Sequence, residues 1–227
     1  SKMSAVLAFL RFLYQARFLV VDPGRDIQLP RLPNKLLPRL PSEEEVLRLL
    51  EAPDTTTPLG LRDRAILELL YSSALRNSEL RQLGLTDVDL DRLEVRVLYG
   101  KGGKQRVVPL GEPAAAWVEE YLRHGRGFLL KDTDHGRLFS SLRGDPISVE
   151  SLVDLCRKHA RAAGLGRVTP HLLRHCCATH MLAREANLRH LQELLGHSSA
   201  ATTQRYTQVQ LSDLRAVHQR CHPREAF

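Results

Sequence analysis

The chain has 227 residues, of which 43% are hydrophobic and 26% charged, a composition typical of a globular protein with a sizeable core. No apolar run approaches the roughly 20 residues that a membrane-spanning helix requires, so we expect no membrane partner. The formal net charge of +7 makes a polyanion the first partner to consider, although charge alone does not identify it.

The first part of the chain predicts an amphipathic helix followed by a linker. Residues 4–20 have one apolar face, and residues 21–41 contain too many prolines for regular structure. Basic residues spaced along this linker, ending with Arg39, suit a segment that follows a DNA backbone. A solvated basic linker is the equally good alternative.

A compact domain is predicted from residue 42 onward. Ser42 and Glu45 form a capping box that opens a helix, and apolar residues at helical spacing predict further helices. Alternating Val95, Val97 and Tyr99, a Gly- and Lys-rich turn, and Val107 and Val108 in the segment that follows predict a β-hairpin. The fold class is therefore α+β, mainly helical with a small antiparallel β-sheet. The expected helices after the first are one opening at Ser42 and those at 58–73, 78–83, 112–123, 148–163, 170–184, 187–195, 199–206 and 211–220.

The start of the helix at 170–184 is a candidate anion site. Thr169 is the expected N-cap, Pro170 takes the first helical position, and His171 and Arg174 follow within the first turn. Free backbone N–H groups and the positive end of the helix dipole favour a phosphate there. For an isolated pair of this kind, a core histidine and a structural salt bridge would be the better interpretation.

Other residues that could bind a phosphate or transfer a proton occur elsewhere in the chain. Arg76 lies between two predicted helices, with Glu79 three residues later in a position to orient its guanidinium group. His197 follows a glycine helix cap, Tyr206 lies on the predicted helix at 199–206, and Lys101 lies in the hairpin turn.

Together these residues resemble the catalytic set of the tyrosine recombinases of the phage integrase family, with the closest likeness to the bacterial Xer recombinases. The segments that carry the resemblance are ALRNSEL, GKGGKQRVVPL, TPHLLRH, ELLGHSS and TTQRYTQV, and the final CHPRE is similar too. The resemblance covers about residues 8–225 and implies site-specific DNA recombination. The implied catalytic residues are Arg76, Lys101, His171, Arg174, His197 and Tyr206.

The chemistry of DNA strand transfer explains these residue types. Arg76 and Arg174 offer bidentate donors for the phosphate, and the hydroxyl of Tyr206 attacks it to form a 3′-phosphotyrosine. His171 accepts the proton of the tyrosine, and Lys101 protonates the leaving 5′-oxygen. His197 is expected to donate a hydrogen bond to the phosphate. No metal, ATP or other cofactor is required, because the arginines and the helix terminus supply the electrostatic stabilisation.

Some assignments within this site have alternatives. Lys104 competes with Lys101 as the acid, and we expect Lys104, Arg106 and Arg39 to bind DNA instead. Glu79 is expected to orient the guanidinium group of Arg76 without contacting the DNA itself. A zinc cluster of the histidines and cysteines within 171–180 is the less favoured interpretation, because their spacing matches no familiar zinc pattern.

The resemblance also implies a domain organisation. Residues 1–41 correspond to the last helix of a truncated N-terminal core-binding domain plus the linker, and residues 42–227 to the catalytic domain. The helix at 211–220 is expected to dock either on a neighbouring protomer or on its own domain. Lacking most of the N-terminal clamp, the chain would bind DNA weakly.

The expected partners are double-stranded DNA carrying a specific site and a homo- or hetero-tetramer on two duplexes, with a DNA translocase as a further candidate. Four cysteines without a disulfide-framework spacing favour a reducing, cytoplasmic compartment. The implied action on DNA adds association with the nucleoid, and chromosome-dimer resolution (chromosome partition at cell division) or integration is the expected task. The rival functions are a type IB topoisomerase and a DNA-binding fragment without turnover.

Overall fold

The computed structural model describes residues 2–25, 27, 39–98, 105–130, 134–196 and 211–225. The chain divides into two compact units, Ser1–Arg39 and Leu40–Phe227. No helix within the described ranges is long and apolar enough to cross a membrane.

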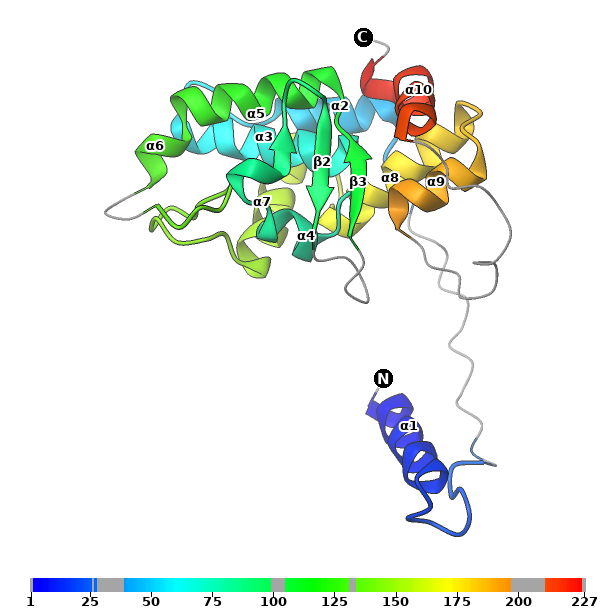
Figure 1. Cartoon of the computed structure of the whole chain (residues 1–227). Coiled ribbons are helices and arrows are strands. Elements are labelled where there is room, and N and C mark those ends of the chain that lie inside the picture. Colours follow the sequence, from blue (N-terminus) through cyan, green and yellow to red (C-terminus); the bar gives the residue numbers. More distant parts are fainter. Residues whose placement is uncertain are drawn as a thin grey trace. The chain divides into compact units, whose positions relative to one another are not determined.

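The described residues of the first unit include helix α1 (Lys2–Gln15) (Figure 1). The helix is shorter than the predicted 4–20. Arg17 has a positive φ of 62°, and the N–H of Phe18 donates to the carbonyl of Leu13 at 2.9 Å. A left-handed residue followed by an N–H that donates to the carbonyl five residues earlier ends an α-helix, so the helix stops before the apolar pattern does.

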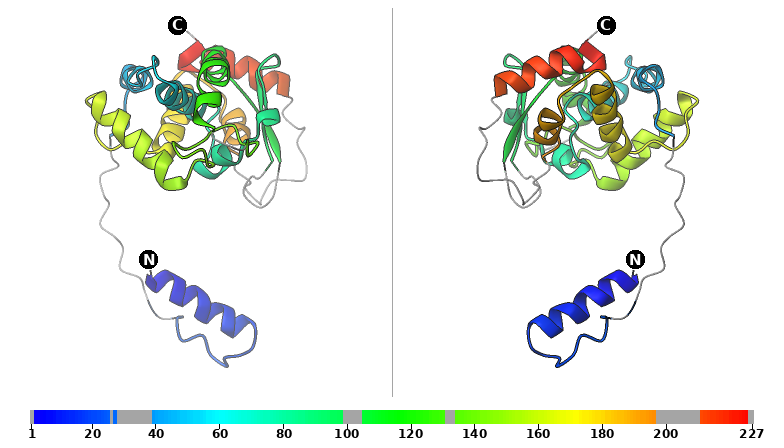
Figure 2. Two further views of the ribbon diagram at one scale, coloured as in Figure 1. Left: turned by 90° about the vertical axis from the view of Figure 1, so that its left-hand side faces the viewer. Right: turned by 90° about the vertical axis from the view of Figure 1, so that its right-hand side faces the viewer.

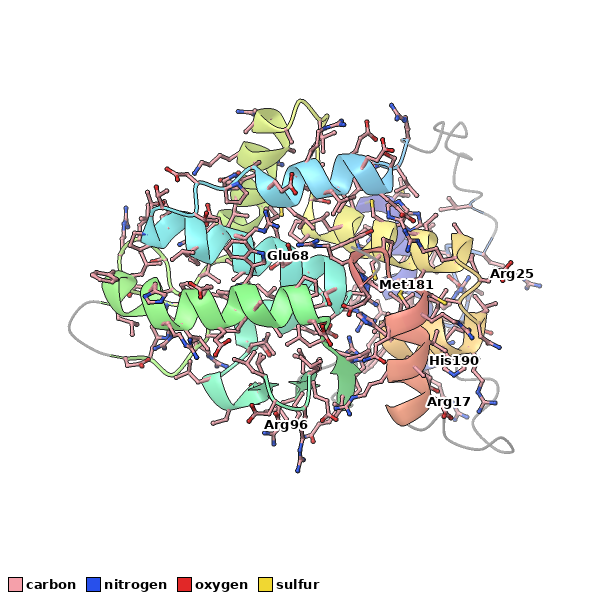
Figure 3. All side chains as sticks on the ribbon, turned by 90° about the horizontal axis from the view of Figure 1, so that it is seen from above. Arg17, Arg25, Glu68, Arg96, Met181 and His190 are labelled. Atoms are coloured by element: carbon pink, nitrogen blue, oxygen red, sulfur yellow. The ribbon has the colours of Figure 1, made fainter. Side chains whose placement is uncertain are left out.

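The second unit is built around α3 (Pro58–Ser72), which is buried continuously from Gly60 to Ser72. Seen from above, α3 lies between α2 (Glu43–Glu51) and α5 (Glu112–His124) (Figure 3), and it also packs against α8 (Pro170–Ala183). A helix that is covered on several sides needs apolar residues around most of its circumference. The charged residues of α3 are therefore buried in pairs, as Arg62 with Asp63 and Arg64 with Glu68.

The helix starts follow the predicted capping chemistry. In the capping box of α2, the N–H of Glu45 donates to Ser42 Oγ at 3.2 Å and the N–H of Ser42 donates to Glu45 Oε2 at 2.8 Å. Thr169 caps α8 in the predicted way, because its Oγ1 accepts from the N–H of Leu172 at 3.2 Å. These local signals are read correctly from sequence because the cap is closed within three residues.

A three-stranded antiparallel sheet of order β1-β2-β3 lies at one side of the unit (Figure 2). The predicted hairpin is present as β2 (Glu94–Val97) and β3 (Arg106–Pro109), with Val95 opposite Val108 and both buried. The strands are shorter than the pattern predicts, and β1 (Val88–Asp89) adds a third strand. The turn at 100–104 lies outside the described residues.

The remaining helices agree with prediction to within one residue, apart from two segments. The predicted helix at 199–206 lies outside the described residues. A short helix at 126–129 was not predicted, because Gly125 and Gly127 interrupt the helical pattern. The α+β, mainly helical fold is confirmed. The elements not yet given are α4 (Asn77–Gln82), α6 (Arg126–Leu129), α7 (Val149–Ala162), α9 (Leu188–Leu195), α10 (Leu211–Cys221) and the 3₁₀ turns Leu85–Asp87 and Pro223–Glu225.

The C-terminal helix α10 packs on its own unit, against β3, α8 and α9 (Figure 1). Leu214, Val217 and Cys221 are buried in this contact. Beyond the helix, Arg224 Nη2 lies 2.9 Å from Oε1 of the fully buried Glu68 on α3. Of the two dockings predicted for this helix, the structure therefore contains the one on its own domain.

Candidate active site

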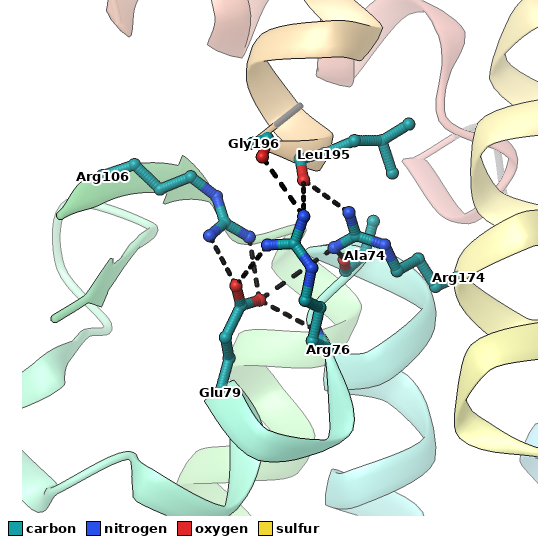
Figure 4. Close-up of polar contacts among 7 residues, drawn as sticks. All are labelled: Ala74, Arg76, Glu79, Arg106, Arg174, Leu195 and Gly196. Atoms are coloured by element: carbon teal, nitrogen blue, oxygen red, sulfur yellow. Dashed lines mark hydrogen bonds and ion pairs between the residues drawn. The ribbon is translucent and has the colours of Figure 1, made fainter. Parts of the chain in front are cut away.

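Four of the predicted site residues lie together: Arg76, Glu79, Arg106 and Arg174 (Figure 4). They come from three separate elements, α4 and its N-cap, strand β3 and helix α8. The predicted Lys101, Lys104, His197 and Tyr206 lie outside the described residues. The described part of the site is thus a cluster of three arginines around one glutamate.

Arg76 is the N-cap residue of α4, and Glu79 stands in the first turn of the same helix. Arg76 Nη1 donates to Glu79 Oε1 at 2.7 Å, and the Arg76 backbone N–H donates to Glu79 Oε2 at 2.8 Å. The contact predicted between the two side chains is present. Both bonds close within one helical turn, so Arg76 is held by its own helix at the backbone and at the guanidinium group.

Arg106 contacts the same carboxylate from β3. Its Nη1 donates to Glu79 Oε1 at 2.8 Å and its Nη2 donates to Glu79 Oε2 at 2.9 Å. This is the parallel two-bond geometry in which arginine binds a carboxylate most strongly. This pairing is not predictable from sequence, because Arg106 and Glu79 are far apart in the chain and only the packing of β3 beside α4 brings them together.

Arg174 projects from α8, and only 5% of the residue is exposed. Its Nη1 donates to the carbonyl of Ala74 and its Nη2 to the carbonyl of Leu195, while its Nη1 lies 4.0 Å from Glu79 Oε2. Burial and the nearby charge of Arg76 lower the pKa of Arg174 to about 10. The group remains a cation at neutral pH, and the two carbonyl oxygens partly replace the water that burial removes.

Both Arg76 and Arg174 point to the C-terminal end of α9 (Figure 4). Arg76 Nη2 donates to the carbonyls of Leu195 and Gly196, at 3.0 and 3.2 Å, and Arg174 donates to the same Leu195 carbonyl. The last carbonyls of a helix lack intrahelical donors and carry the negative end of its dipole, so guanidinium groups are well placed there. Gly196 has a φ of +56° and directly precedes the predicted His197.

His171 occupies the first turn of α8 and is exposed, one turn before the buried Arg174. An exposed imidazole beside a helix N-terminus can reach a bound anion. The core-histidine alternative does not hold for His171. Arg39, at the end of the first unit, is exposed as well.

The zinc cluster considered from sequence is not assembled. His171 and His175 are exposed, whereas Cys176 and Cys177 are buried on the other side of α8. His180 Nδ1 is 2.8 Å from the hydroxyl of Tyr71 and its Nε2 is 3.0 Å from the carbonyl of Pro41. Among the residues the structure describes, no group of three His, Cys, Asp or Glu residues is arranged to hold a metal ion.

Glu79 is the electrostatic centre of the cluster. Burial by itself would raise its pKa, but the hydrogen bonds from Arg106 and from the Arg76 backbone, with the charge of Arg106, outweigh burial and lower the pKa to about 2. Glu79 is therefore an anion at neutral pH. Three guanidinium groups and one carboxylate leave the cluster with an excess of positive charge, held in position before any ligand binds.

The arrangement suits a phosphodiester that passes through a more highly charged transition state. Attack by a deprotonated oxygen adds negative charge to the non-bridging oxygens of the phosphate, and fixed guanidinium groups stabilise that charge without having to move into place. The backbone carbonyls that hold Arg76 and Arg174 were not predicted from sequence. A carbonyl has no residue-type signal, and the roles of these carbonyls depend on where helices α3 and α9 end, next to Ala74 and at Leu195 and Gly196.

Comparison with known proteins identifies the family of this chain. The sequence profile of the Phage integrase family matches residues 40–212. The chain belongs to this family. It is 44% identical to the tyrosine recombinase XerD of Pseudomonas aeruginosa over 223 residues, which cover 98% of this chain and 74% of that protein. It is 41% identical to XerD of Vibrio cholerae over 224 residues, again covering 98% of this chain and 74% of the relative.

Solved structures of the family are similar as well. The crystal structure of XerA recombinase matches with a TM-score of 0.64 and 32% identity, covering 96% of this chain and 76% of that chain. XerH site-specific recombinase, in a post-cleavage complex with a palindromic difH substrate, matches with a TM-score of 0.64 and 26% identity over 86% of this chain and 56% of that chain. The prediction of a tyrosine recombinase enzyme with likeness to the Xer recombinases is confirmed. This chain is thus a DNA recombinase by family, and the roles of its individual residues stay predictions.

Proposed function

We propose that this chain cleaves and rejoins DNA at a specific site through a covalent 3′-phosphotyrosine at Tyr206. The observation that carries the proposal is the preformed arginine cluster, in which Arg76 and Arg174 both donate to the carbonyl of Leu195, two residues before His197. Family membership supplies the reaction class. The related XerH is described with a palindromic difH substrate in a post-cleavage complex, so we propose duplex DNA with paired half-sites as the substrate.

In the proposed reaction, the scissile phosphate binds between Arg76 and Arg174. The oxygen of Tyr206 forms a bond to phosphorus as the bond from phosphorus to the 5′-oxygen breaks. His171 takes the phenolic proton, and Lys101 gives a proton to the departing 5′-oxygen. His197 donates a hydrogen bond to the phosphate. The number of phosphoester bonds is unchanged, so the step needs no ATP, and we assign it no metal or other cofactor.

The same chemistry run in reverse rejoins DNA. A 5′-hydroxyl from a second duplex attacks the phosphotyrosine and releases Tyr206. Two such exchanges recombine two sites, and we propose a homo- or hetero-tetramer on two duplexes for this purpose. Residues 1–41 would then be the end of a DNA-clamping domain and its linker, residues 42–227 the catalytic domain, and the protein would work on the nucleoid in the cytoplasm. Chromosome-dimer resolution and integration are the candidate tasks, with a DNA translocase as a candidate partner for the first.

The test is a nicked suicide duplex that carries a palindromic recombination site. The nick lets a short 5′-hydroxyl fragment diffuse away after cleavage, so that a covalent protein–DNA adduct accumulates and is seen on a denaturing gel. We expect an adduct with the wild-type chain and none with Tyr206→Phe. Peptide mapping should locate the DNA on Tyr206.

Four outcomes would contradict the proposal. Adduct formation by Tyr206→Phe, or an adduct mapped to another residue, would remove the nucleophile. Retention of duplex binding without any adduct would indicate a DNA-binding fragment. If supercoiled DNA is relaxed while no strand is ever transferred to a second duplex, the activity is that of a topoisomerase.

A further inference from the structure

Arg106 is the residue of the cluster for which the proposed reaction gives no role. It lies on β3 opposite Val97, and its side chain is 15% exposed. Both of its Nη groups donate to Glu79, at 2.8 and 2.9 Å. Its Nε is buried and has no hydrogen-bond partner among the described residues. The guanidinium group is therefore mostly buried and bound to Glu79, which makes it poorly accessible to a DNA phosphate.

Arg106 also covers the end of α9. A Cβ atom placed on Gly196 would lie 3.1 Å from Cδ, Nε and Cζ of Arg106, which is closer than ordinary van der Waals contact. The side chain thus lies directly against the backbone that accepts hydrogen bonds from Arg76. Arg106 thereby contacts Glu79 on α4 and the backbone at Gly196, which are close in the chain to Arg76 and to the predicted His197.

The hydrogen bonds form a chain through Glu79. Each oxygen of this carboxylate accepts one bond from Arg106 and one bond from Arg76, with all four between 2.7 and 2.9 Å. Without Arg106, the buried carboxylate would keep only Arg76 as a strong partner and would attract its guanidinium group away from the carbonyls of Leu195 and Gly196. A displacement of Arg76 by about 1 Å is sufficient to slow a reaction by about 100-fold.

We propose that Arg106 is a positioning residue: it holds Glu79 from the side of β3, and so fixes Arg76 and the backbone at Gly196 in the geometry that binds the scissile phosphate. The proposal rests on the proposed function for its effect on cleavage, and on the contacts above for its effect on Glu79. It differs from the expectation from sequence that Arg106 binds DNA directly.

Single-turnover cleavage of the suicide duplex distinguishes positioning from DNA contact. For Arg106→Gln we expect the maximal cleavage rate at saturating DNA to fall about 10- to 100-fold, with the Kd for intact duplex changed less than about threefold. Arg106→Lys keeps the charge but not the two-bond geometry, so it should resemble Arg106→Gln. Arg96→Gln is the matched control, because Arg96 is an exposed arginine on the neighbouring strand β2 that donates to the carbonyl of Thr86.

The double variant Glu79→Gln with Arg106→Gln adds a second criterion. If Arg106 acts through Glu79, the double variant should cleave no more slowly than Glu79→Gln alone. A direct phosphate contact gives the opposite pattern: weaker duplex binding, a salt dependence reduced by about one counterion, and an unchanged rate at saturating DNA. That pattern would overturn the proposal.

A measurement without DNA separates this proposal from the proposed function. The NMR chemical shift of the Glu79 carboxyl carbon reports whether this group is protonated. In the wild type the shift should stay that of a carboxylate as the pH falls to about 3, whereas in Arg106→Gln and Arg106→Lys the carboxyl group should titrate near its ordinary pKa. If the wild type forms no adduct, the proposed function fails while this titration still tests the positioning. An unchanged Glu79 titration in both variants would refute the role of Arg106, whatever the cleavage assay shows.

Discussion

Arg174 carries a charge at a position from which water is almost excluded. Two backbone carbonyls accept its hydrogen bonds, and Arg76 lies close enough to lower its pKa. Burying a cation beside other cations costs folding free energy, and proteins retain such arrangements mainly where a ligand uses the charge. A phosphate in the cluster would relieve the repulsion among the guanidinium groups.

The first prediction concerns the shape of this cation. Arg174→Lys retains a positive charge but loses the fork that reaches Ala74 and Leu195 at the same time, so we expect cleavage of the suicide duplex to slow by at least about 100-fold. Arg184→Lys is the control, because Arg184 caps the same helix and pairs with Glu43 away from the cluster. Equal cleavage by the Arg174 variant and the wild type would show that a point charge is enough.

The spacing of Arg76 and Glu79 predicts the contact between their side chains, whereas the contact between Glu79 and Arg106 is not predicted from sequence. The first contact closes within one helical turn, and a pattern of residues three apart is sufficient to predict it. The second contact depends on the register of β3 against β2 and on the packing of the sheet beside α4. The spacing of Arg106 and Glu79 in the chain does not predict the distance between their side chains.

Helix α10 is attached to the domain by polar contacts as well as by its apolar face. His218 Nε2 lies 2.9 Å from the carbonyl of Ser72, and His222 Nε2 lies 3.2 Å from the carbonyl of Tyr71. The two rings stack with centroids 4.6 Å apart. Since a carbonyl only accepts, both Nε2 atoms carry the proton, and the N–H of Arg224 donates to His222 Nδ1, which identifies His222 as neutral.

Burial lowers the pKa of both histidines, that of His218 to about 4 and that of His222 further below its ordinary value. In the unfolded chain they take up protons near pH 6.5, whereas in the folded chain they do so only at lower pH. The unfolded state thus binds more protons between these values. The stability that the neutral histidines contribute is present above about pH 6.5 and is lost as the pH falls toward 4.

The second prediction follows from that difference. The free energy of unfolding, measured with urea, should fall between pH 7 and pH 4.5, by up to about 1.4 kcal/mol per pH unit for each histidine. His218→Gln keeps a donor for the Ser72 carbonyl and should make this dependence less steep by about one proton. His175→Gln, at an exposed position of α8, should leave it unchanged. The same slope in both variants would mean that other groups cause the pH dependence.

The whole molecule carries a net charge of +7, and its family acts on DNA. We expect the cluster around Glu79 to use its charge in the reaction and other basic residues to supply binding energy. Duplex affinity should therefore fall steeply with salt, because each neutralised phosphate releases counterions.

The third prediction separates these two uses of charge. Lys104→Gln should weaken duplex binding and reduce the slope of log affinity against log salt by about one, with the cleavage rate at saturating DNA unchanged. Arg123→Gln removes the same charge at an exposed position of α5 where it pairs with Glu119, and should change neither quantity. A lower maximal rate for the Lys104 variant would instead favour Lys104 over Lys101 as the general acid.

Much of this molecule was readable from the order of its residues. Local signals act over a few residues, so sequence alone determined the helices, the hairpin and the family. These signals are the capping box at Ser42, the proline and histidine that open α8, the glycine that ends α9 and the alternation in β2. The tertiary structure decided what surrounds the arginines: the carbonyls of Ala74 and Leu195, the fork from Arg106 to Glu79, and the docking of α10 on its own domain. These contacts join residues distant in the chain, and their distances depend on how the elements pack.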